Sequence, residues 1–200
     1  MDPASDADRQ RRLAALLAHW LPPLPEALAT LARYVRPVSY PAGAVLVAEG
    51  EPADDLVLLE TGVVRAYVLR HNKEVNHRLL NAPAAALAYR SHLQGRPADE
   101  TLQALSPVQG LKVAFRRYRT EHPGLLAETF RRVLAETHAE ALQRRLDLLQ
   151  GRSAAQRYAY FLRHQDPQVI ATTPGFHIAS YLGITPESLS RVRARLEKDQ

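Results

Sequence analysis

The last 26 residues constrain the fold of this chain more than any other segment. From Gly175 they read GFHIASYLGITPESLSRVRARLEK. Two short helical patterns meet at Gly183, and glycine is the residue that most often follows a helix in the left-handed conformation. Thr185 is a suitable cap for the second helix, and Pro186 suits its first position. The segment therefore predicts a helix-turn-helix, which places one helix in the DNA major groove.

The spacing of apolar residues predicts which faces of these helices are buried. Ile178, Ala179 and Leu182 lie on one face of the first helix, with the small Ala179 where the two helices approach closely. Leu189, Val192 and Leu196 form the stripe of the second helix. An ordinary helical hairpin with a charged solvent face is the alternative interpretation. The residues left facing outward on the second helix are Glu187, Ser188, Ser190, Arg191, Arg193 and Arg195.

Composition limits the classes that the chain can belong to. Its 200 residues suit one medium domain or two small ones, and 46% hydrophobic content is enough for a core. The net charge of +5 permits an anionic partner. The absence of cysteine excludes disulfides, thiolate metal sites and thiol redox switches. We see neither a signal peptide nor an apolar run of about 18 residues, so we expect a cytoplasmic protein without a membrane partner.

The pattern of apolar and polar residues changes along the chain, and so do the elements that it predicts. Two short helices are expected from about Arg9 to Arg36, broken at the proline-rich residues 21–25. Short apolar or alternating runs then predict a strand meander or barrel. The expected fold class is α+β. Strands are expected at 45–47, 56–59 and 63–68, helices at 123–150 and 153–164, and domains at 1–122 (sensor domain), 123–150 (dimerisation helix) and 151–200 (helix-turn-helix).

A narrow apolar stripe follows the long helix of residues 123–150. A stripe of this kind favours coiled-coil pairing with a second copy of the chain. The alternative is that the stripe packs on its own barrel. Gly151, directly after the helix, is a natural hinge. The residues expected at the dimer interface are Leu126, Phe130, Val133, Thr137 and Ala141.

The order of barrel, long helix and helix-turn-helix resembles the Crp/Fnr family of bacterial transcription regulators. The resemblance rests on Tyr40-Pro41-Ala42-Gly43, Glu49-Gly50-Glu51, Thr61-Gly62, the long helix and, above all, Ile178 to Arg191. It implies an N-terminal double-stranded β-roll, similar to a cyclic nucleotide-binding jelly roll, and a homodimeric regulator that binds a near-palindromic duplex. RNA polymerase is a further candidate partner. The likeness is greatest to short family members that end soon after the second helix.

The same resemblance implies roles for residues of the second helix. The family pattern Glu-x-x-Ser-Arg falls on Glu187, Ser190 and Arg191, which would read bases in half-sites similar to T-T-G-A. The chemistry suits these roles, because arginine can make a bidentate contact to guanine and a carboxylate can accept from cytosine N4. Thr185, Ser188 and Arg195 are expected to contact DNA too, as phosphate contacts that fix the register.

Cyclic nucleotides are not expected to be effectors. Nucleotide-binding relatives use a Glu for the ribose hydroxyl and an Arg for the phosphate, and these positions correspond to Ala88 and Ala98. An unpaired phosphate would be costly to bury. Arg90 or Arg96 in a shifted register is the alternative. We predict no cofactor, and no residue of the sequence points to an effector.

Other chemistry has weaker support. The spacing of His71, Glu74 and His77 resembles a metal site, but an exposed polar hairpin explains it as well. Tyr89, Arg90 and His92 either line a ligand pocket or belong to a surface helix. We therefore expect no metal and no enzyme activity. The alternatives are an interaction module whose DNA-binding end is degenerate and an enzyme built on a cupin-like roll.

Overall fold

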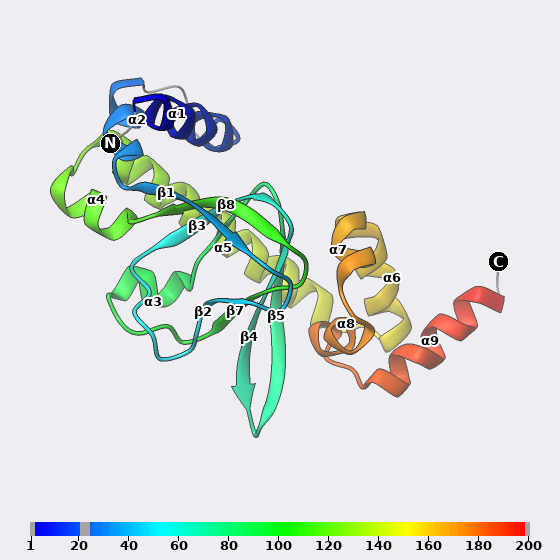
Figure 1. Cartoon of the computed structure of the whole chain (residues 1–200). Helices are drawn as coiled ribbons and strands as arrows, with labels where there is room; N and C mark the ends of the chain where they lie inside the picture. Colours follow the sequence, from blue (N-terminus) through cyan, green and yellow to red (C-terminus); the bar gives the residue numbers. More distant parts are fainter. Residues whose placement is uncertain (1–2, 21–24, 199–200) are drawn as a thin grey trace.

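The computed structural model describes residues 3–20 and 25–198, with side chains from residue 6 to residue 196 within those ranges (Figure 1). The proline-rich break at 21–25 lies mostly outside the described residues. No helix in the described part is long and apolar enough to cross a membrane. The helices are α1 Pro3–Leu17, α2 Pro25–Ala32, α3 Tyr89–Gln94, α4 Phe115–Glu121, α5 Leu125–Leu149, α6 Ala154–His164, α7 Pro167–Thr172, α8 Gly175–Leu182 and α9 Pro186–Lys198.

Two four-stranded antiparallel sheets form a roll in the N-terminal half. Their strand orders are β1-β8-β3-β6 and β2-β7-β4-β5. Neighbouring strands in each sheet are mostly far apart in sequence, as in a jelly roll. The fold class expected from the sequence, a β-roll followed by a long helix and C-terminal helices, is confirmed. The strands are β1 Val35–Tyr40, β2 Val45–Val47, β3 Leu56–Thr61, β4 Val63–Arg70, β5 Lys73–Asn81, β6 Ala84–Ala86, β7 Thr101–Ala104 and β8 Val108–Val113.

Strand β3 shows why the sequence has a continuous apolar run at residues 56–59. Successive side chains of a strand point to opposite faces of the sheet. Leu56 and Leu58 face a cluster outside the roll, formed with α1, α2, α4 and α5. Val57 and Leu59 face the cluster inside the roll. Both faces of the strand are therefore buried over residues 56–59, which accounts for the lack of polar residues in that stretch.

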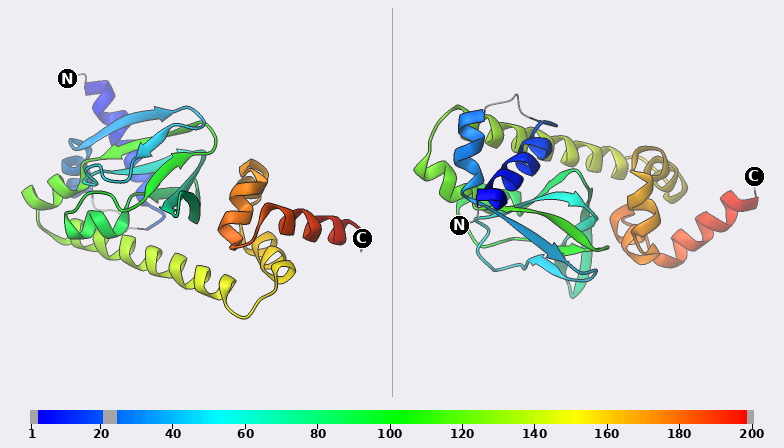
Figure 2. Two further views of the ribbon diagram at one scale, coloured as in Figure 1. Left: turned by 90° about the horizontal axis from the view of Figure 1, so that it is seen from below. Right: turned by 45° about the horizontal axis from the view of Figure 1, so that its top comes forward.

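Helix α5 corrects one expectation from the sequence. It runs along one side of the roll and ends beside the C-terminal helices (Figure 2). Leu126 and Phe130 are 4% and 0% exposed, and both lie in the outer cluster of the chain's own roll. These two residues have no surface left for a second copy, so the prediction that they form a dimer interface is wrong. The alternative, packing on the chain's own roll, is correct for this part of the helix.

The C-terminal helices pack around a third hydrophobic cluster. The sequence analysis missed two short helices in this half of the chain. The cluster contains Tyr158, Phe161, Ile178 and Leu182, together with Val63 and Leu79 of the roll. Helix α4 precedes the long helix, and α7 lies between α6 and the helix-turn-helix. Both are six to seven residues long, too short for a clear 3.6-residue period.

Candidate nucleic-acid interface

The turn between α8 and α9 is built as the sequence predicts. Gly183 has φ 64° and ends α8 in the left-handed conformation. The N–H of Ile184 donates to the carbonyl of Ala179 at 3.0 Å, which closes the last turn of α8. At the start of α9, the N–H of Ser188 donates to Thr185 Oγ1 at 3.2 Å. A β-carbon at position 183 would lie 3.3 Å from Leu149, so the close approach also favours glycine there.

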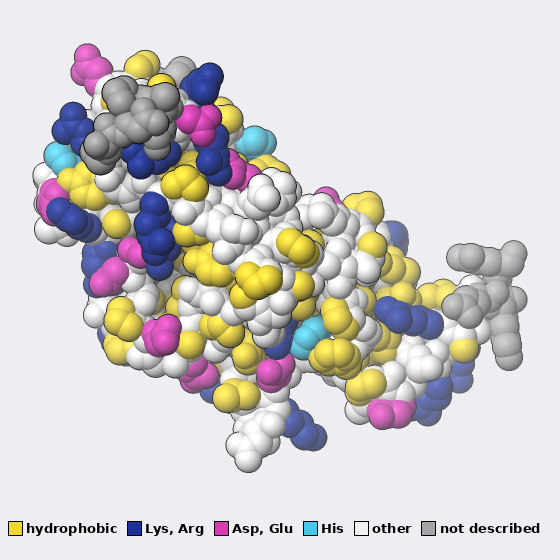
Figure 3. Space-filling model, in the orientation of Figure 1, with side chains coloured by type: hydrophobic (Ala, Val, Ile, Leu, Met, Phe, Trp, Pro, Cys, Tyr) yellow, Lys and Arg dark blue, Asp and Glu magenta, His cyan; other side chains and the backbone are white. Residues whose placement is uncertain are grey.

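Helix α9 presents one buried and one exposed face. Leu189 is 2% exposed and Val192 is 8% exposed, and both pack on Ile178, Ala179 and Leu182 of α8. Figure 3 shows Lys and Arg side chains gathered over the outer part of α9. The exposed face contains Glu187, Ser190, Arg191, Ala194 and Arg195, with Thr185 and the half-buried Ser188 at its start.

Three of the residues expected to contact DNA also contact one another. Ser188 Oγ accepts from Thr185 Oγ1 at 3.2 Å and from Arg191 Nη2 at 3.3 Å. Hydrogen bonds from its own backbone and from Thr185 lower the pKa of Glu187, so its carboxylate is ionised at neutral pH. Thr185, Ser188 and Arg191 are thus brought together at the start of α9. Arg195 lies one turn further along the same helix.

Arg193 and Arg157 connect the C-terminal helices to one another and to α5, a role that the sequence analysis did not assign to either residue. Arg193 Nε donates to Tyr158 Oη at 3.1 Å, and its guanidinium lies over the Tyr158 ring. It therefore packs on α6 and does not belong to the outer face. Arg157 donates to the carbonyl oxygens of Leu149 and Leu182, both at 3.1 Å. It thereby connects the end of α5 to the end of α8.

A buried polar network joins the roll to α8. Arg65 of β4 is 3% exposed and Asn76 of β5 is 0% exposed. Arg65 Nη1 donates to His177 Nδ1 at 3.1 Å, and Asn76 Nδ2 donates to the same nitrogen at 3.2 Å. Glu74 Oε2 accepts from Arg65 Nη1 at 2.6 Å. Ser180 Oγ accepts from the N–H of Asn76 at 3.0 Å, so two residues of α8 are fixed to β5.

The network requires a neutral imidazole at His177. An arginine can only donate, so His177 Nδ1 must accept and cannot carry a proton. Burial lowers the pKa of His177 to about 4, and the positive charge of Arg65 lowers it further. Burial also lowers the pKa of His138, on α5, to about 4. Both histidines are therefore neutral in the folded protein at pH 7.

Folding stability is expected to fall as the pH is lowered from about 6.5 toward 4. In this range the unfolded chain binds protons at His138 and His177, whereas the folded chain does not. We expect each histidine to reduce the free energy of unfolding by about 2 kcal/mol between pH 7.5 and 5.0. Urea unfolding at both pH values measures the loss.

A matched pair of variants tests the cause of this pH dependence. His177→Gln should reduce the loss by about half, because one of the two titrating groups is removed. His71→Asn, at an exposed hairpin position, should leave it unchanged. An unaltered pH dependence in His177→Gln would show that His177 is not responsible.

Buried alanines occupy the two positions that correspond, by the sequence match, to the nucleotide-binding Glu and Arg of relatives. Ala88 and Ala98 are 1% and 4% exposed and lie in the cluster inside the roll. The two residues after Ala98 are acidic. Asp99 accepts from Ser91 and Arg90, and Glu100 pairs with Arg78 and His77. Two carboxylates therefore follow Ala98 directly, and both are engaged by side chains of the chain itself.

Tyr89, Arg90 and His92, the residues considered for a ligand pocket, make contacts in three different places. Tyr89 packs on α5, with its ring stacked on His138 at 4.4 Å, while the exposed Arg90 pairs with Asp99. His92 is buried and contacts the carbonyl of Ala53 at 3.1 Å. The three predicted pocket residues thus point to different surroundings. In the described ranges, no group of three or more His, Asp or Glu side chains is placed to hold a metal ion.

The surroundings of the His71–His77 segment explain its polar residues without a metal. Glu74 pairs with Arg65 at 2.6 Å, and His77 Nε2 lies 2.9 Å from Glu100. His71 has φ 49° at the tip of the β4–β5 hairpin. The three side chains therefore belong to separate contacts.

Comparison with known proteins agrees with this architecture. Residues 37–119 match the family model of the cyclic nucleotide-binding domain. No curated protein matches the chain in sequence. Among solved structures, FixK2 from Bradyrhizobium japonicum is 23% identical with a TM-score of 0.68, and the match covers 82% of this chain and 85% of FixK2.

Two further solved structures are similar over most of their length. The c-di-GMP-responsive global regulator CLP of Xanthomonas campestris has 13% identity and a TM-score of 0.68, with 87% of this chain and 92% of CLP covered. A mutant of CooA from Carboxydothermus hydrogenoformans has 21% identity and a TM-score of 0.61, with 83% and 78% covered. Residues 37–119 thus match a cyclic nucleotide-binding domain, and the chain as a whole is similar in fold to regulators of the Crp/Fnr family.

Proposed function

We propose that the protein is a homodimeric transcription regulator that binds specific DNA sequences and has no enzyme activity. The observation that carries the proposal is the exposed outer face of α9. Its opposite face is buried on α8, while Glu187, Ser190 and Arg191 are exposed. This is the arrangement that a recognition helix needs to enter the major groove. Such a regulator works beside promoters in the cytoplasm, so we include RNA polymerase among its proposed partners.

In this proposal the outer face of α9 divides into two kinds of contact. Arg191 donates to guanine O6 and N7, Glu187 accepts from cytosine N4, and Ser190 makes an adaptable third contact. Thr185, Ser188 and Arg195 contact phosphates, which fix the register of the helix but do not read the sequence. The half-sites are similar to T-T-G-A.

Dimerisation is proposed along the exposed side of α5. Val133 is half-buried, Thr137 is exposed and Ala141 is half-buried, so these three members of the predicted interface keep surface for a second copy. Residues 1–122 then form the sensor domain, 123–150 the dimerisation helix and 151–200 the DNA-binding domain. In a dimer, the centres of the two half-sites would lie roughly 34 Å apart.

We propose further that DNA binding needs no cyclic nucleotide. The buried Ala88 and Ala98 have no group that could bind the ribose or the phosphate. Asp99 and Glu100 would repel a phosphate brought to this place. Arg90, the alternative cation, is already paired with Asp99.

Selection of random duplex DNA by the purified full chain tests the proposal. We expect a near-palindrome with T-T-G-A-like arms to be enriched without added nucleotide, and the same site to be enriched when cAMP is present. The selection is performed at two salt concentrations, because phosphate contacts alone give steeply salt-dependent binding without sequence preference. Recovery of unselected, salt-sensitive DNA alone would contradict sequence-specific binding, and enrichment only with cAMP would contradict nucleotide independence.

A further inference from the structure

A basic pocket of about 360 Å³ lies at the end of the roll where β1 begins and β8 ends, beside α4 (Figure 1). Four cationic side chains line it, and Asp55 is the one carboxylate among the described lining residues. The pocket therefore has an excess of positive charge, and its volume lies within the range of small-molecule sites. The four cations are Arg33, Arg36, Lys112 and Arg117.

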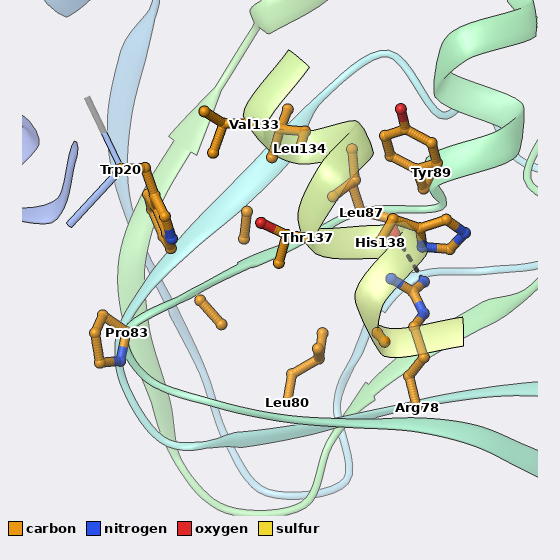
Figure 4. A pocket seen from close by; sticks show the side chains of 13 residues that line it. Trp20, Arg78, Leu80, Pro83, Leu87, Tyr89, Val133, Leu134, Thr137 and His138 are labelled. Carbon is orange, nitrogen blue, oxygen red and sulfur yellow. Dashed lines mark hydrogen bonds between the residues drawn. The ribbon is translucent and has the colours of Figure 1, made fainter. Parts of the chain in front are cut away.

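The basic pocket is separate from the surfaces that the proposed function uses. The cavity beside Trp20 lies between the roll and α5, and its wall residues Val133, Thr137 and Ala141 belong to the proposed dimer interface (Figure 4). The outer face of α9 lies at the other end of the molecule (Figure 1). A ligand of the basic pocket therefore occupies neither the dimer interface nor the DNA-binding face.

The sheet places two of the four cations at positions that are unfavourable for folding. Arg36 of β1 is directly opposite Lys112 of β8, and Lys112 is opposite Val57 of β3. Residues in opposite positions share a face of the sheet, and Val57 on this face belongs to the inner cluster. The side chain of Lys112 is only 24% exposed, and like charges in opposite positions destabilise a sheet. A cost of this kind is expected at functional sites.

Only part of this positive charge is balanced within the chain. Lys112 Nζ lies 3.1 Å from Asp55 Oδ2, and Arg117 Nε pairs at 2.8 Å with a glutamate of its own helix. Arg33 and Arg36 are exposed, and neither forms an ion pair with another residue of the described ranges. Two arginines are therefore available to a ligand.

Arginine side chains indicate what kind of anion the pocket accepts. A guanidinium presents its N–H donors in a planar fork, which matches two oxygens of one phosphate group. Arg33 and Arg36 supply two such forks, one for each phosphate of a diphosphate. A diphosphate also carries more than one negative charge, as the excess of cations in the pocket requires.

We propose that the basic pocket binds the diphosphate group of a small molecule. Arg33 and Arg36 donate to its phosphate oxygens, and Lys112 and Arg117 supply further positive charge from the walls. Free pyrophosphate and a nucleoside diphosphate present the same group, so both are sources of this ligand chemistry.

Calorimetric titration of the full-length protein with sodium pyrophosphate, without divalent cations, tests the proposal. We expect saturable binding with half-saturation at about 0.1 mM at low ionic strength. Added salt should weaken the binding, because Arg33 and Arg36 are exposed. Cyclic AMP, which has a single phosphodiester charge, should bind at least about tenfold more weakly.

A titration with ADP distinguishes the two sources of the diphosphate group. Binding of ADP that is as tight as that of pyrophosphate, or tighter, identifies a nucleotide as the ligand. Binding that is at least about tenfold weaker identifies free pyrophosphate, because the nucleoside then adds no contact and one phosphate loses charge.

Two arginine variants and a matched control locate the binding. Arg36→Gln and Arg33→Gln should each weaken pyrophosphate binding at least about fivefold, because each removes a charge-assisted hydrogen-bond donor. Arg70→Gln removes the same charge from an exposed position of β4 outside the pocket, and should leave binding unchanged. Arg33 lies between α2 and β1, so its replacement leaves the sheet intact. Circular dichroism confirms that the three variants keep the parent fold.

Three results would overturn the proposal. They are the absence of saturable binding in the parent protein, equal binding by both pocket variants, and a loss in Arg70→Gln as large as theirs. If pyrophosphate binds to the cations of α9 instead, Arg36→Gln and Arg33→Gln will bind it like the parent. The test uses no DNA, so its failure would leave the proposed DNA binding untouched.

Discussion

Arg191→Ala is expected to reduce sequence preference strongly while leaving most non-specific DNA binding intact. Arg191 is exposed on the outer face of α9, and its Nη2 lies 3.3 Å from Ser188 Oγ. A bidentate contact to guanine contributes about 1–3 kcal/mol of discrimination, or roughly 5- to 150-fold for each half-site. Fluorescence anisotropy with the selected duplex and a scrambled duplex measures the change.

Two other arginines supply the controls for this experiment. Arg195→Ala should weaken binding to both duplexes by a similar factor and reduce the salt slope by about 1, because a phosphate contact carries no sequence information. Arg132→Ala, on the exposed side of α5, should change neither affinity. If Arg191→Ala binds the selected duplex as tightly as the parent protein, then Arg191 is not a base reader.

Phe130→Ala is expected to lower the free energy of unfolding by about 3–5 kcal/mol, the usual cost of replacing a buried phenylalanine. Phe130 is 0% exposed, and its ring meets the Phe115 ring edge-on at a centroid distance of 4.9 Å. The loss arises within one chain, because these contacts join α5 to its own roll. Urea unfolding followed by circular dichroism measures it.

The same helix provides a control for this variant. Leu142→Ala, at a leucine that is 45% exposed, should change the free energy of unfolding by less than about 1 kcal/mol. Sedimentation velocity distinguishes the two interpretations of Phe130. If Phe130→Ala were stably folded but dissociated into monomers, the side chain would act between subunits, contrary to its position in the structure.

The sequence alone determined the parts of this protein that depend on local signals. Gly183, Thr185 and Pro186 predict the turn and the start of α9, because each residue favours one backbone conformation or one capping contact. The apolar period of α9 predicts which of its faces is buried. Strands β2, β3 and β4 and the long helix are predicted for the same reason, since alternation and helical period are visible within one segment.

Only the tertiary structure decided which partner each buried side chain meets. The stripe of α5 has the same period whether it packs on a second copy or on its own roll, and the roll covers Leu126 and Phe130. Asn76 and His177 are 101 residues apart in the chain. Their contact, like the cavity beside Trp20, depends on how distant elements pack together, and no local pattern of residues encodes that arrangement.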